Sequence, residues 1–147
     1  MKEKICIDMV KHQTQLRVRY GETDQMGYLY YGRYAEYFEV GRVELMRSMG
    51  ISYKSMETDF GVFMPVMNYS TRYLRPAYYD NLLDIHTEVR ELPDMSIHFH
   101  TEIFNDLGKI ITTGTVQLAF IEVMSKKRVS LPPFLQQVLT PYFENHD

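Results

Sequence analysis

Asp24 stands in a short connection that can place a carboxylate beside free backbone N–H groups. It lies within the stretch from Arg19 to Tyr34, between a strand-like pattern and a long helical one, and Gly27 follows three residues later. The first N–H groups of a helix have no partner inside the helix, and they favour negative charge nearby. A carboxylate at this place can act as a base or a nucleophile while the amides stabilise an oxyanion. The plainer alternative is that Asp24 only caps the helix.

Three histidines form the other candidate cluster. His98 and His100 fall on one face of a strand pattern, and His86 lies on a neighbouring one. This spacing can bind a metal ion, but no carboxylate–His motif accompanies it. We therefore expect no metal site and no other cofactor.

The helical pattern that follows Asp24 runs from residue 31 to 49. Its apolar positions recur every three or four residues, which is typical of a helix with one buried face: Tyr34, Phe38, Gly41, Leu45 and Met49. Gly50 is well placed to end the helix in a left-handed conformation. Gly41 costs about 1 kcal/mol relative to Ala inside a helix, so we predict that another element packs closely against it.

Strand patterns occupy most of the remaining chain. Alternating or β-rich runs cover residues 14–20, 62–74, 83–89, 97–103 and 109–122. Pro65 marks a bulge or an edge position, and a short helix is predicted from Phe134 to Leu139. The only element large enough to cover one face of such a sheet is the long helix. We therefore predict an α+β fold in which an antiparallel sheet curls around a central helix, with an exposed edge that can pair with a second copy.

Bulk composition excludes several classes of protein. At 147 residues the chain is expected to form one domain, residues 1–147. A net charge of −3 and a pI near 5.9 do not suit a nucleic-acid-binding protein. Cys6 is the single cysteine, no run approaches the length of a membrane span, and the first ten residues lack the apolar core of a signal peptide. We expect a cytoplasmic protein without integral membrane contact.

Four segments together resemble the 4-hydroxybenzoyl-CoA thioesterase and YbgC-like branch of the hotdog-fold acyl-CoA thioesterases. The resemblance runs from about Leu16 to Leu131, and its segments are Val18–Gly27, Tyr30–Tyr34, Tyr37–Arg42 with Glu44-Leu45, and Arg72–Ala77 with Tyr79-Asp80. The Thr-Asp-x-x-Gly element is short, but it gains weight from the Tyr-Leu-Arg-Pro-Ala segment at the expected distance. The resemblance implies a hotdog fold and hydrolysis of an acyl-CoA, or acyl carrier protein, thioester.

The resemblance also implies roles for individual residues. Asp24 matches the catalytic carboxylate, which either attacks the thioester carbonyl or activates a water. The backbone N–H of Tyr31 would hold the oxyanion, and Gly27 would let the backbone approach the substrate. The active site would lie at the interface of a homodimer, and a tetramer built from two dimers is the larger alternative.

Further substrate contacts are open to two explanations each. Tyr34 and Met64 either line the acyl pocket or belong to the core, and Arg72 and Arg75 either contact CoA phosphates or pair with nearby carboxylates. The chain also departs from the usual pattern, since Tyr31 stands where many YbgC-type members have His. The function classes that remain are an acyl-CoA thioesterase, an acyl-carrier-protein thioesterase of lipid synthesis, and a non-catalytic acyl-binding module.

Overall fold

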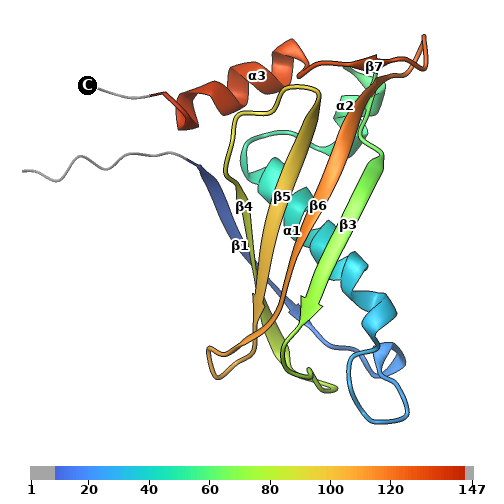
Figure 1. Cartoon of the computed structure of the whole chain (residues 1–147), viewed down its shortest axis with the longest axis vertical. Coiled ribbons are helices and arrows are strands. Elements are labelled where there is room, and N and C mark those ends of the chain that lie inside the picture. The colour runs from blue at the N-terminus through green and yellow to red at the C-terminus, as the bar shows by residue number, and fades with distance from the viewer. Residues whose placement is uncertain (1–8, 145–147) are drawn as a thin grey trace, which may run out of the picture.

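The chain folds into an antiparallel sheet of seven strands with one long helix against a face of it (Figure 1). The computed structural model describes residues 9–144. The strands are β1 Val10–Arg17, β2 Val62–Phe63, β3 Val66–Tyr73, β4 Leu82–Val89, β5 Ser96–Phe104, β6 Ile110–Glu122 and β7 Arg128–Val129. The helices are α1 Tyr34–Ser48, α2 Tyr53–Thr58 and α3 Pro133–Leu139, with 3₁₀ turns η1 Tyr20–Glu22, η2 Tyr31–Arg33 and η3 Thr140–Tyr142. The predicted α+β class is confirmed.

The sheet is ordered β1-β4-β5-β6, and β6 also pairs with β2, β3 and β7. Within the described residues, β3 pairs only with β6, so its other edge is unpaired. Figure 1 shows β3 at one side of the sheet and β1 at the other, with α1 running across the face between them. None of the helices in residues 9–144 is long and apolar enough to cross a membrane.

The core lies between α1 and the inner face of the sheet. Alternate residues of β4 and β5 point to this face and are buried, whereas their neighbours are only partly covered. From the helix, Phe38, Leu45 and Met46 are at most 1% exposed. A Cβ on Gly41 would lie 2.5 Å from Thr87 Oγ1 and 2.8 Å from Ile85 Cγ2. The predicted close approach at Gly41 is therefore confirmed.

Most predicted elements are present, but several boundaries differ. The helical pattern from residue 31 begins as η2, continues as α1, and is followed by Gly50 at φ 83° as expected. The predicted limits of the first strand, residues 14 and 20, were both wrong. Pairing with β4 extends the strand back to Val10, and it ends at Arg17, before the turn that begins at Tyr20. The run over residues 62–74 is interrupted before Val66, where Pro65 cannot donate to a ladder. The short elements α2 and β7 were not predicted.

Candidate active site

Asp24 sits in a tight turn that uses only one of its two carboxylate oxygens. Its Oδ1 accepts hydrogen bonds from the backbone N–H groups of Met26, at 2.9 Å, and Tyr28, at 3.1 Å. The N–H of Gly27 donates to the carbonyl of Asp24 at 2.9 Å, and Gly27 has φ 81°, a conformation that favours glycine. Among the described residues, nothing donates to Oδ2. The local sequence thus holds the carboxylate in place and leaves one oxygen free for chemistry.

The Asp24 turn forms one wall of a cavity of about 290 Å³. Most of the lining is aromatic or apolar, and it comes from the Asp24 loop, the start of α1 and the end of β3. The lining residues are Asp24, Met26, Tyr28, Leu29, Tyr31, Tyr34, Tyr73, Leu74, Arg75 and Pro76. We call this cavity the acyl pocket, after the site that the family resemblance implies.

The helix that the Asp24 loop leads into begins beside the same cavity. Tyr30 is extended, with φ −62° and ψ 132°, and the 3₁₀ turn η2 begins at Tyr31. No residue within 9–144 accepts a hydrogen bond from the N–H of Tyr31. The N–H of Arg33, two residues later, donates to Tyr30 O at 2.9 Å. The carbonyl of Tyr31 accepts from the N–H of Tyr34 and from the Tyr73 hydroxyl, the latter at 3.2 Å. Within the part of the chain that the structure describes, the acyl pocket therefore combines a carboxylate that has one oxygen without a donor and a helix-start amide without an acceptor.

Glu22 supports this loop and was not singled out from the sequence. Its side chain is buried, and its Oε1 accepts from the N–H of Arg19 at 2.9 Å and from the Tyr37 hydroxyl at 2.8 Å. Burial acts to raise the pKa of Glu22, but hydrogen bonds from Arg19 and Tyr37 outweigh it, and the pKa is lowered. Burial and the bond to Glu22 raise the pKa of Tyr37. The charged Glu22 thus ties the loop to α1. The signal available in the sequence was its opposite charge three residues from Arg19, a spacing at which side chains meet on a helical turn.

The sequence-predicted substrate residues are not all brought together. Tyr34 and Arg75 line the acyl pocket, and the Arg75 guanidinium also donates to Ile110 O at 2.6 Å. Met64 is half-buried in the break between β2 and β3 and does not line the pocket. Arg72 also lies elsewhere, because successive residues of a strand point to opposite faces and Tyr73 points inward.

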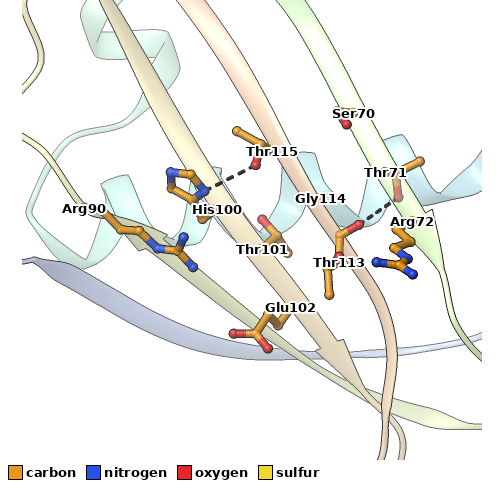
Figure 2. Close-up of a pocket in the computed structure, with 10 residues that line it drawn as sticks. All are labelled: Ser70, Thr71, Arg72, Arg90, His100, Thr101, Glu102, Thr113, Gly114 and Thr115. Carbon is orange, nitrogen blue, oxygen red and sulfur yellow. Dashed lines mark hydrogen bonds between the residues drawn. The ribbon is translucent and has the colours of Figure 1, made fainter.

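Arg72 instead lines a polar cavity of about 430 Å³ on the outer face of the sheet (Figure 2). His100 and Arg90 lie on the far side of this cavity, and His100 Nδ1 is 3.2 Å from the Thr115 hydroxyl. Burial, followed by the charge of Arg90, lowers the pKa of His100. Arg90 is itself paired with Glu88 at 2.9 Å.

No three His, Cys, Asp or Glu side chains among residues 9–144 are grouped to hold a metal ion. This cavity lacks the pairing of a free carboxylate with a helix start that marks the acyl pocket.

Comparisons with known proteins agree with this architecture. A family model described as the thioesterase-like superfamily matches residues 18–139. The putative acyl-CoA thioesterase YneP of Bacillus subtilis is 33% identical over 101 residues, covering 69% of this chain and 72% of that protein. The acyl-CoA thioester hydrolase YbgC of Escherichia coli is 26% identical over 117 residues, covering 80% of this chain and 87% of its own length.

A solved structure shows the same likeness in three dimensions. The DHNA-CoA thioesterase of Staphylococcus aureus superposes with a TM-score of 0.80 at 31% identity, covering 86% of this chain and 85% of that chain. The matched family residues include the Asp24 loop, α1 and the whole of the sheet from β2 to β7. The chain therefore belongs to the thioesterase-like superfamily, as a hotdog-fold member akin to the YbgC-type acyl-CoA thioesterases.

Proposed function

We propose that this thioester hydrolase cleaves its acyl-CoA substrate in the acyl pocket, with Asp24 as the base or nucleophile. The observation that carries the proposal is the position of Asp24. Two backbone amides hold its Oδ1, and none of residues 9–144 donates to Oδ2, in a cavity that also contains the start of a helix. Relatives named as acyl-CoA thioester hydrolases support a CoA thioester as the substrate.

Two routes from this geometry give the same products. In the first, Asp24 takes a proton from water, the hydroxide adds to the thioester carbonyl, and the C–S bond breaks to release free acid and CoA thiolate. In the second, Asp24 itself adds to the carbonyl and expels the thiolate, and water then hydrolyses the mixed anhydride. Both routes place negative charge on the carbonyl oxygen. We assign the N–H of Tyr31 as the donor that stabilises this charge.

The lining of the acyl pocket supports a compact, ring-containing acyl group. Tyr34 is only 3% exposed, and its ring lies 5.1 Å from that of Tyr73 in an edge-to-face arrangement. Aromatic rings favour such contacts with one another by about 0.5–1.5 kcal/mol beyond area burial. The Staphylococcus aureus relative is named a DHNA-CoA thioesterase, and a relative from Synechococcus elongatus is named a 1,4-dihydroxy-2-naphthoyl-CoA hydrolase. We therefore expect aryl acyl groups to be preferred over long aliphatic chains.

The test is steady-state release of free thiol from a panel of CoA thioesters with aryl, short aliphatic and long aliphatic acyl groups. We expect the highest kcat/KM with an aryl group. Turnover of carrier-protein thioesters but no CoA thioester would move the assignment to the carrier-protein class. No turnover of either kind would leave a non-catalytic acyl-binding module and contradict the proposal.

We also propose that the chain forms a homodimer through the free edge of β3. Apolar side chains are exposed along this strand, where Val66 is 51% and Met67 48% exposed. An unpaired, apolar edge is a template for pairing with another strand. An isologous pair of β3 edges would extend the sheet across two copies, and the acyl pocket lies at the end of this strand.

Lysine substitution at both Val66 and Met67 should convert the dimer to a monomer at micromolar concentration, because charges on an edge oppose strand pairing. Multi-angle light scattering measures the mass directly. Met124→Lys is the matched control, because Met124 is 89% exposed in the turn between β6 and β7. A dimer that survives the double substitution would place the interface elsewhere.

A further inference from the structure

We propose that Tyr73 is a positioning residue whose hydroxyl ties β3 to the turn at the start of α1 and so aligns the Tyr31 amide. The proposal rests on the assignment of that amide as the oxyanion donor. It starts from one contact: the Tyr73 hydroxyl donates to the carbonyl of Tyr31 at 3.2 Å, across 42 positions in the chain. Among the described residues, no other side-chain hydrogen bond joins η2 to the sheet.

The peptide that carries the Tyr31 N–H lies between two such ties. On its N-terminal side, the N–H of Tyr30 donates to Glu22 O at 2.9 Å. On its C-terminal side, the Tyr73 hydroxyl holds the carbonyl of Tyr31. A 3₁₀ turn has poorer hydrogen-bond geometry than an α-helix and is easily deformed. Without the second tie, this part of the chain would keep the bond from Tyr30 to Glu22 and the turn's own bond from the N–H of Tyr34 to Tyr31 O.

The ring of Tyr73 is held independently of its hydroxyl. It packs edge-to-face against Tyr34 at 5.1 Å and against Tyr31 at 6.4 Å between ring centroids. Tyr73 belongs to β3, and its backbone pairs with Thr112 of β6. Phenylalanine at this position would therefore retain the ring contacts and the strand, and would remove the hydroxyl that bonds to the turn.

Alignment matters because an oxyanion donor acts only at the place where charge develops. Loss of a whole donor costs about 10²–10³ in kcat, and small misplacements of catalytic groups carry a similar kind of penalty. A misaligned turn should raise the barrier to chemistry without weakening ground-state binding.

The experiment compares Tyr73→Phe with wild type and with Tyr79→Phe on the best CoA thioester. Tyr79 is an exposed tyrosine of the neighbouring loop whose ring packs on Tyr20, which makes its phenylalanine variant a matched control. We expect kcat of Tyr73→Phe to fall about tenfold with KM within about twofold, a change confined to the transition state. The amide ¹H–¹⁵N resonances of Tyr31 and Gly32 should shift in this variant and not in the control.

Three outcomes would overturn the proposal: an unchanged kcat, a loss expressed only in KM, or unshifted Tyr31 and Gly32 amides in a folded Tyr73→Phe protein. The same assay on Asp24→Asn separates this failure from failure of the proposed function. If Asp24→Asn is inactive and Tyr73→Phe resembles wild type, the proposed function stands and the positioning role is wrong. If Asp24→Asn retains full turnover, the site assignment itself is wrong.

Discussion

Asp24→Asn should lower kcat for CoA thioester hydrolysis by at least about 10²-fold, or about 2.7 kcal/mol of transition-state stabilisation. The amide oxygen of Asn can still accept from the N–H groups of Met26 and Tyr28, so the turn should persist. What the substitution removes is the negative charge of the carboxylate, which both catalytic routes require. KM should change little, because the neutral side chain has almost the same shape.

The measurement is thiol release at saturating substrate, with circular dichroism to show that the variant is folded. Asp106→Asn is the matched control, because Asp106 is exposed in the β5–β6 hairpin. Equal kcat for wild type and Asp24→Asn would contradict a catalytic role for Asp24 and return it to the status of a turn-forming residue.

Substitution of Gly41 should cause the second large effect, on stability. Helix propensity alone predicts that Gly41→Ala stabilises the protein by about 1 kcal/mol. The structure predicts instead that Gly41→Ala lowers stability, since the new Cβ would lie 2.5 Å from Thr87 Oγ1 and 2.8 Å from Ile85 Cγ2. Both neighbours are β-branched and cannot turn aside freely. We expect Gly41→Ala to lower the free energy of unfolding by about 1 kcal/mol, and Gly41→Val to lower it by about 3 kcal/mol.

Urea unfolding of the two variants and wild type measures this effect. Ala35→Val, on the exposed side of α1, controls for β-branching within the helix and should cost only about 0.5 kcal/mol. A Gly41→Ala protein more stable than wild type would show that α1 can move away from β4 at little cost.

Local interactions account for what could be predicted of the site. The turn from Asp24 to Tyr28 closes through hydrogen bonds between near neighbours, and a glycine at positive φ completes it. The helix that follows is encoded by apolar residues at helical spacing, of which Phe38 and Leu45 are buried as the pattern requires. Both depend on contacts within about one turn of chain, which sequence patterns report directly.

Contacts between distant segments determined the features of the site and of the sheet that the sequence did not predict. Arg72 and Arg75 lie three residues apart, but β3 ends at Tyr73, so Arg72 faces the outer cavity while Arg75 reaches the acyl pocket. Pairing with β4 set the true limits of β1, which its own alternation did not reveal.

By itself, the sequence determined the α+β class, the central helix with its close approach at Gly41, and the turn that presents Asp24. Only the tertiary structure decided which residues share the acyl pocket with Asp24. It is the pairing of β3 with β6 that brings Tyr73 to the carbonyl of Tyr31. Strand register is a property of two segments together, and no single segment contains it.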